Sequence, residues 1–158
     1  MKIVRNVFLV ALFAAVISIS SSVSAHVLDG AKEWNGHYYK VIAMTMNWKN
    51  ARNFCESIGG HLATAETIEE NEFIKQIFIK SAKCDYCWIG AYRDKQIWRW
   101  VTGVTMSDYF DWSNGKLNYY TLGLSRKFNG KWETDNEYYT YYFICEWEKA
   151  EDAHDSTL

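Results

Sequence analysis

The 158-residue chain contains no proline, so none of its loops can be fixed by a prolyl peptide bond. It also lacks an Asn-x-Ser/Thr sequon, a nucleophile motif, a glycine-rich phosphate loop and a metalloprotease helix. After the first 25 residues, no apolar run is long enough to span a membrane. Because no motif of a recognisable enzyme class is found, we expect a protein that is not an enzyme.

Basic residues do not predominate either. Seventeen Lys and Arg stand against nineteen Asp and Glu, and leaving out Lys2 and Arg5 of the N-terminal segment lowers the formal net charge from −2 to about −4. Such a surface does not favour nucleic acid or anionic membranes as partners. Aromatic residues, in contrast, make up 17% of the chain. Tyr and Trp suit both cores and binding faces that need one apolar side and one polar tip.

Residues 1–25 have the pattern of a secretory signal peptide. Two basic residues precede an apolar run at positions 7–19, and the triplet Val-Ser-Ala ends at position 25. The run, about 13 residues long, is shorter than the roughly 18 expected of a spanning helix. A retained membrane anchor is therefore the weaker alternative. We expect cleavage after Ala25, a secreted, periplasmic or extracellular location, and one domain of about 133 residues beginning at His26.

Periodicity in the mature chain predicts helices first and strands afterwards, apart from one early strand. Thr45 is the expected N-cap of a first helix that ends at Gly59-Gly60, and Thr67 with Glu70 forms a capping-box pattern for a second helix reaching about Lys80. The expected strands are residues 37–43, 88–92, 98–101 and 139–147. This order favours an α+β fold with an antiparallel sheet. The polar tail, residues 149–158, is expected to be disordered.

The ordered set of landmark residues resembles a known family, the C-type lectin-like domain. The landmarks are Trp48, Cys55, residues 59–63 (GGHLA), Glu70, Phe73, residues 88–90 (WIG), Trp98, Trp100, Trp112, Gly130, Trp132 and residues 143–146 (FICE). The resemblance assigns residues 34–148 to this domain, after a short lead at 26–33. It implies two helices, two small antiparallel sheets and a long loop region that carries a ligand site at one end.

The resemblance also implies a disulfide between Cys55 and Cys145, which export to an oxidising compartment would support. Cys84 and Cys87 then remain, because the family's usual second bridge has no counterpart here and the long loop must be held by packing. Three interpretations stay open for this pair: a local structural disulfide, which we favour; free or intermolecular thiols; and a redox pair. The redox motif normally follows a strand and opens a helix, which is not the order here.

No cofactor is expected, and calcium is disfavoured at the loop site, although Glu133, Asp135 and Glu137 could gather a weakly held ion if the loop folds back differently. Sugar-binding members of the family hold Ca²⁺ with Glu-Pro-Asn or Gln-Pro-Asp in the loop and Trp-Asn-Asp on the next strand, whereas this chain has Lys116-Leu117-Asn118 and residues 132–134 (WET). Lys116 repels a cation that needs six to eight oxygen ligands. Asn118 and Glu133 survive as possible oxygens, with Asp135 one step out of register. A solvated polar turn is the expected role of the acidic cluster at 133–137.

The predicted ligand site follows from the place that the resemblance gives it and from the amides and tyrosines found there. Its residues are Lys116, Asn118, Tyr119, Tyr120, Glu133, Asp135 and Asn136. Two binding functions remain open, because a fold does not decide between them. One is a lectin that recognises glycans with little or no calcium. The other is a module that recognises a cell-surface protein.

Overall fold

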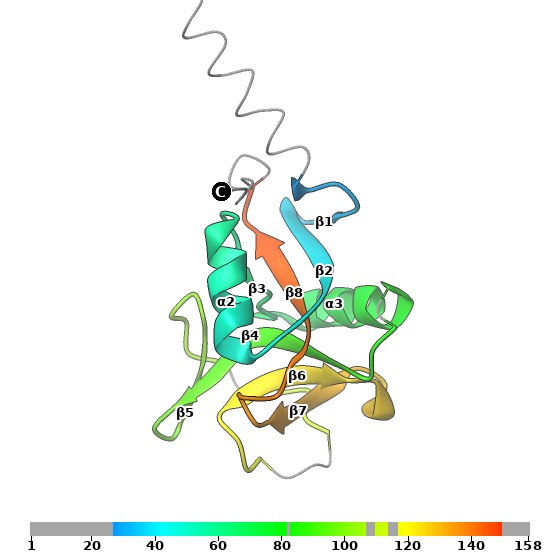
Figure 1. Cartoon of the computed structure of the whole chain (residues 1–158). Helices are drawn as coiled ribbons and strands as arrows, with labels where there is room; N and C mark the ends of the chain where they lie inside the picture. Colours follow the sequence, from blue (N-terminus) through cyan, green and yellow to red (C-terminus); the bar gives the residue numbers. More distant parts are fainter. Residues whose placement is uncertain (1–26, 82, 107–109, 114–116, 150–158) are drawn as a thin grey trace, which may run out of the picture.

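The computed structural model describes residues 27–81, 83–106, 110–113 and 117–149. The predicted signal peptide, Lys116 and nearly all of the predicted C-terminal tail lie outside these residues. The described elements are β1 (Lys32–Trp34), β2 (His37–Met46), α2 (Trp48–Ser57), β3 (His61–Leu62), α3 (Ile68–Ser81), β4 (Tyr86–Asp94), β5 (Ile97–Trp100), β6 (Thr121–Ser125), the 3₁₀ turn η1 (Arg126–Phe128), β7 (Lys131–Asp135) and β8 (Tyr141–Trp147). The α+β fold class is therefore confirmed (Figure 1).

The strands form one connected network within the described residues. Its order is β1-β2-β8-β4-β6-β7, with β3 also pairing with β8 and β5 with β4. All these pairings are antiparallel except that of β4 with β8, in which Trp88 lies opposite Phe143. The short parallel pairing joins the expected antiparallel pairings into one mixed sheet. It makes β8 the strand that connects the upper and lower halves of Figure 1.

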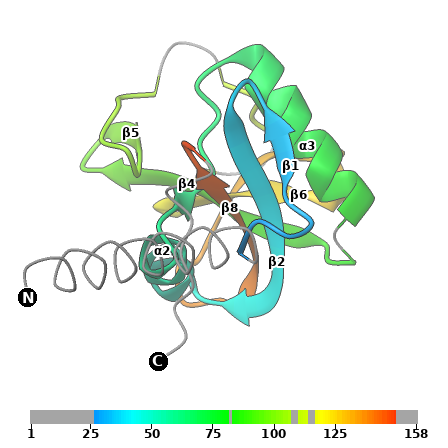
Figure 2. The same cartoon turned by 90° about the horizontal axis from the view of Figure 1, so that it is seen from above.

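The two helices lie on opposite sides of β8 and β2, as Figure 2 shows from above. Alternate residues of β8 point to the two sides, as strand geometry requires. Ile144 belongs to the core cluster that contains Ile74 and Phe78 of α3. Phe143 and Cys145 belong to the cluster that contains Ala51 and Cys55 of α2. β8 is therefore covered by core on both faces.

The disulfide between Cys55 and Cys145 is confirmed, and it links α2 to β8 inside the core. The predicted local bridge is not present: Cys84 and Cys87 are free thiols. Burial raises the pKa of the Cys87 thiol, so this thiol keeps its proton. Its hydrogen bond to Cys84 lowers the pKa of the Cys84 thiol. The structure thus favours the free-thiol interpretation of the pair.

Both helix starts differ from the sequence prediction in an informative way. Asn47, not Thr45, caps α2, since its side-chain oxygen accepts a hydrogen bond from the backbone N–H of Asn50 at 2.8 Å. At α3, Thr67 Oγ1 accepts from the Glu70 backbone N–H at 3.1 Å, as a capping box requires. The Glu70 carboxylate, however, turns away from Thr67 to other donors. Only half of the predicted capping box is therefore formed.

Candidate functional site

The predicted ligand site lies at one end of the hairpin formed by β6 and β7, near the bottom of Figure 1. Thr121, the first residue of β6, pairs with Asp135, the last residue of β7. The segments just outside this pair, residues 117–120 and 136–139, therefore leave the hairpin at the same end. Asn118, Tyr119, Tyr120 and Asn136 are brought together in this way, whereas the position of Lys116 is not described. We call these two segments the loop end.

Exposed tyrosines dominate the loop end. Tyr120 is 55% exposed, and Tyr119, Tyr138 and Tyr139 also present large parts of their rings to solvent. The Arg93 guanidinium carbon lies 4.5 Å from the centroid of the Tyr120 ring, a cation–π contact, and the Arg93 backbone N–H donates to the Tyr120 carbonyl at 2.8 Å. Sequence reasoning missed Arg93, since its pairing with Tyr120 bridges 27 positions and no local motif indicates it.

The acidic cluster is a hydrogen-bonded turn at the end of β7. Asp135 accepts from the Tyr141 hydroxyl through Oδ2 and from the Asn136 backbone N–H through Oδ1, both at 2.7 Å. Asn136 Oδ1 accepts from the Tyr138 backbone N–H at 3.1 Å. Burial raises the pKa of Tyr141, and the hydrogen bond to Asp135 raises it further, so the phenol remains a donor. Both carboxylate oxygens of Asp135 are already engaged within the protein.

This donor set does not fit the calcium ion of sugar-binding family members. Ca²⁺ takes six to eight oxygen ligands, several of them carboxylate or amide. Binding an ion here would compete with the Tyr141 and Asn136 bonds that hold Asp135, while Thr134, buried on β7, stands where the family has an aspartate. No step of ligand recognition is therefore assigned to calcium at the loop end.

Side-chain and backbone contacts hold the segment that precedes the loop end. The backbone N–H of Trp132 donates to the Asp111 carbonyl, and that of Ser113 donates to the Trp132 carbonyl, each at 2.8 Å. The Asp111 carboxylate accepts from Lys75 Nζ at 2.9 Å and from Asn71 Nδ2 at 3.0 Å. Hydrogen bonds and an ion pair thereby attach residues 110–113 to both β7 and α3.

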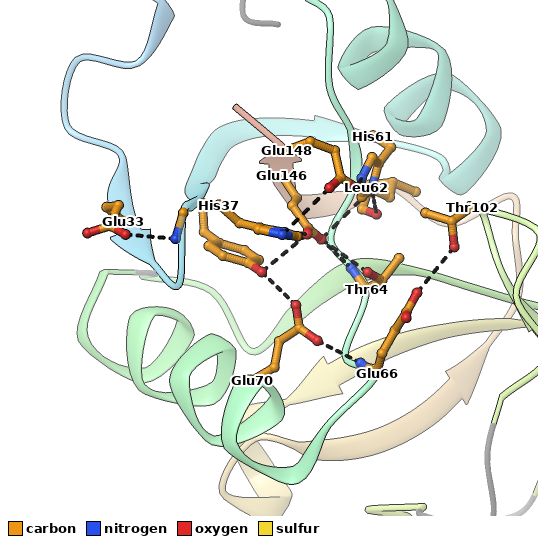
Figure 3. Close-up of polar contacts among 12 residues, drawn as sticks. Glu33, His37, His61, Leu62, Thr64, Glu66, Glu70, Thr102, Glu146 and Glu148 are labelled. Carbon is orange, nitrogen blue, oxygen red and sulfur yellow. Dashed lines mark hydrogen bonds and ion pairs between the residues drawn. The ribbon is translucent and has the colours of Figure 1, made fainter. Parts of the chain in front are cut away.

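A second polar cluster, which sequence reasoning missed, surrounds Glu146 in β8 (Figure 3). Glu146 is 1% exposed, and its carboxylate accepts from the Thr64 backbone N–H at 2.8 Å, the Tyr39 hydroxyl at 3.2 Å and His37 Nδ1 at 2.8 Å. The Tyr39 hydroxyl also lies 2.6 Å from Glu70 Oε1. Burial raises the pKa of Glu146, although its hydrogen bonds act in the opposite direction.

The one sequence signal for this cluster is a glutamate inside the apolar run of residues 143–147, because a buried carboxylate requires partners. Those partners lie 82 to 109 positions away, so the sequence does not identify them. Possible metal-ligand atoms of His37, Glu146 and Glu148 lie within 4.8 Å of one another. Within the part of the chain that the structure describes, these three residues could together hold a metal ion.

Two helices and a connected mixed sheet, as found in the described residues, are the arrangement of a C-type lectin-like fold. The sequence model of the lectin C-type domain matches residues 44–147, and the chain belongs to this family. It is 29% identical over 134 residues to C-type lectin 16 of Crotalus adamanteus, covering 80% of this chain and 86% of that protein.

Two further relatives bear on function. The chain is 27% identical over 130 residues to the B1 subunit of the snaclec coagulation factor IX/factor X-binding protein of Trimeresurus stejnegeri, covering 80% of this chain and 87% of that subunit. Among solved structures it is similar to SPL-2, a Ca²⁺-independent C-type lectin from Saxidomus purpuratus, at 28% identity and a TM-score of 0.68. The match covers 75% of this chain and 91% of SPL-2. One of these relatives is thus named as a subunit of a coagulation factor-binding protein, and the other is named as a lectin.

Proposed function

We propose that this protein is a secreted, non-catalytic module that binds carbohydrate at the loop end without calcium. The observation that carries the proposal is the exposure of Tyr119 and Tyr120 beside the amides of Asn118 and Asn136. Sugars present an apolar face that stacks on an aromatic ring and hydroxyls that bond to amides and phenols. Both kinds of group are available here, and the similarity to a lectin named as Ca²⁺-independent supports the proposal.

Arg93 has a definite part in this arrangement. Its guanidinium carbon lies 4.5 Å from the centroid of the Tyr120 ring and 5.9 Å from that of the Trp98 ring. Its Nε is buried and has no hydrogen-bond partner in the structure. A cation that is held behind an aromatic ring limits the motion of that ring, which lowers the entropy lost when a ligand stacks on its other face. We therefore assign Arg93 the role of positioning Tyr120 for the ligand.

Recognition of a protein is the second candidate. Tyrosine and arginine are over-represented among the residues that contribute most to protein interfaces, and the exposed rings of Tyr138 and Tyr139 extend the surface beyond the amides. The name of the snaclec relative, a subunit of a coagulation factor-binding protein, favours this alternative. A ligand of this kind would be a cell-surface or extracellular protein, with a footprint much larger than that of one sugar.

A glycan array probed with and without EDTA distinguishes these functions. We expect binding to one group of glycans that EDTA does not reduce, and a loss of about tenfold or more in Tyr120→Ala and in Asn118→Ala. Ile68→Ala is the control, since Ile68 on α3 is 53% exposed, close to the 55% of Tyr120. Binding that disappears in EDTA, or that is unchanged in both loop-end variants, would contradict the proposal; a blank array with capture of a defined extracellular protein would favour the alternative.

Calcium titration of the chelator-treated protein gives a separate prediction for the acidic cluster. We expect that Glu133→Gln leaves the calorimetric response to Ca²⁺ unchanged, because Asp135 is engaged by Tyr141 and the neighbouring oxygens are too few. Asp135→Asn is the companion variant at the same end of β7. Sub-micromolar calcium binding that Glu133→Gln abolishes would show that the cluster is a metal site.

Export predicts the N-terminus of the mature protein. Sequencing of material recovered outside the producing cell should begin at His26, because the Val-Ser-Ala triplet ends at Ala25. No helix among the described residues is long and apolar enough to cross a membrane. Mature protein that retains residues 1–25 would instead indicate an anchored form.

A further inference from the structure

A cavity of about 240 Å³ lies between α3 and the edge strand β1. Figure 2 shows these two elements side by side, and the rings of Trp34 in β1 and Phe73 in α3 stack with 6.0 Å between their centroids. Side chains from both elements line the cavity: Lys32, Glu33, Phe73, Gln76, Ile77 and Lys80. None of them belongs to the loop end, so this cavity is separate from the carbohydrate site proposed above.

One face of α3 gives the cavity an apolar floor. The lining residues of α3 are three or four positions apart, and residues at this spacing share one face of a helix. Ile77 is buried in the core, and the half-buried Phe73 ring makes an edge-to-face contact with the Tyr39 ring at 5.4 Å between centroids. Because this packing already holds both side chains in place, a ligand that contacts them loses little entropy in ordering them.

Two ammonium groups belong to the exposed margin of this floor. Trp34 contacts α3, so Lys32, two positions before it in β1, has its side chain on the same side of the strand. Lys80 lies in the last turn of α3, and both lysines are exposed. Within the described residues neither of them forms an ion pair, in contrast to Lys75 and Lys131. Both positive charges are therefore available to a ligand.

The carboxylates that adjoin the cavity in the sequence are already engaged. Glu33 Oε1 accepts a hydrogen bond from the backbone N–H of Gly36 at 2.9 Å. Glu72 Oε1, one position before Phe73, lies 2.7 Å from Lys75 Nζ. Two lysines stand against one glutamate in the lining, so its net charge is positive, although that of the whole chain is negative.

We propose that this cavity binds a small amphiphilic carboxylate, a free carboxylic acid of the medium-chain fatty acid class. Phe73 and Ile77 contact its apolar body, while Lys32 and Lys80 hold its carboxylate at the margin. A water molecule takes about 30 Å³ in the liquid, so the cavity has room for about eight groups of that size. A neutral sugar would leave the lysines without a counter-charge and would place hydroxyls against the apolar floor, which is unfavourable.

Titration of the full mature protein with octanoate, followed by amide NMR, tests this site. We expect saturable shift changes at residues 32–34 and 73–80 and none at residues 117–120. Octanamide has the same length without the charge, and it should bind about fivefold or more weakly than octanoate. Butanoate lacks four of the methylene groups that the floor would bury, so its affinity should be lower by about tenfold or more.

Variants of exposed residues separate the charge from the apolar floor. Lys32→Gln/Lys80→Gln should lower octanoate affinity about fivefold or more and leave octanamide affinity unchanged, whereas Lys49→Gln, at an exposed lysine on α2, should change neither. Gln76→Trp places a large ring at the cavity and should abolish the binding of both compounds.

Three results would overturn the proposal. The first is the absence of saturable shifts with octanoate. The second is equal affinity of the parent protein for octanoate and octanamide. The third is a set of shifts confined to residues 117–120 and 136–139, since octanoate would then bind at the loop end.

Discussion

Replacing Cys145 with serine is expected to lower the free energy of unfolding by about 4 kcal/mol. The disulfide joins positions 90 residues apart, and in the chain-entropy model the unfolded state loses more freedom for a longer closed loop. Both sulfurs are fully buried, so the variant also places a hydroxyl and a free thiol in the core. Single domains are stable by about 5 to 15 kcal/mol, so a loss of this size removes a substantial part of that margin.

Urea unfolding monitored by tryptophan fluorescence measures this effect. The double variant Cys55→Ala/Cys145→Ala should lose a similar amount without leaving a free thiol in place of the disulfide. Cys84→Ser should lose much less, because Cys84 forms no disulfide. Peptide mapping without reduction should recover Cys55 linked to Cys145. Recovery of Cys55 linked to Cys84, or an unchanged midpoint in Cys145→Ser, would contradict the structure.

Replacing Trp132 with alanine is expected to cost about 3 to 5 kcal/mol, the usual range for removing a large buried ring. Trp132 is fully buried, its ring meets those of Trp100 and Trp112 edge to face at 5.7 Å, and its indole N–H donates to Asn71 Oδ1 at 2.8 Å. Its backbone also bonds to Asp111 and Ser113. The segment at residues 110–113 is expected to lose order together with the core.

Two variants separate packing from hydrogen bonding. Trp132→Phe keeps an aromatic ring but loses the bond to Asn71 and part of the buried ring volume, so we expect a smaller loss than in Trp132→Ala, about 1 to 3 kcal/mol. Trp98→Ala removes a half-buried ring and should also cost less than Trp132→Ala. Amide hydrogen exchange at residues 110–113 reports on the loop. Equal stability of Trp132→Ala and Trp98→Ala would show that the ring at position 132 does not support this region.

The sequence predicted those elements whose signals are local. Residues 48–57 repeat apolar side chains at helical spacing, and the strands at 88–92 and 98–101 are rich in β-forming side chains. β6 was missed because all five of its residues are buried, so its polarity does not alternate. Gly123 in its middle resembles a turn signal, yet a Cβ there would lie 2.2 Å from the Tyr86 ring. Close packing, and not a turn, requires this glycine.

The candidate sites depend on contacts that no local pattern records. The tyrosines and amides of the loop end were found because the family resemblance gave their place, and their ligand stays a proposal. Arg93 behind Tyr120 and the donors around Glu146 were not found, because register across several strands decides which side chains meet. A buried glutamate in an apolar strand indicates that hydrogen-bond partners are present, but only the folded structure shows which residues they are.

β8 is the last element of the described chain, and it pairs with β2, β3 and β4. A ribosome that has not yet released residues 141–147 therefore holds a chain without its central strand, in which neither core cluster can close. Folding must begin late and draw together segments far apart in sequence, which is a slow route. A premature stop codon that removes residues 141–147 would remove the whole fold and not merely one edge of it.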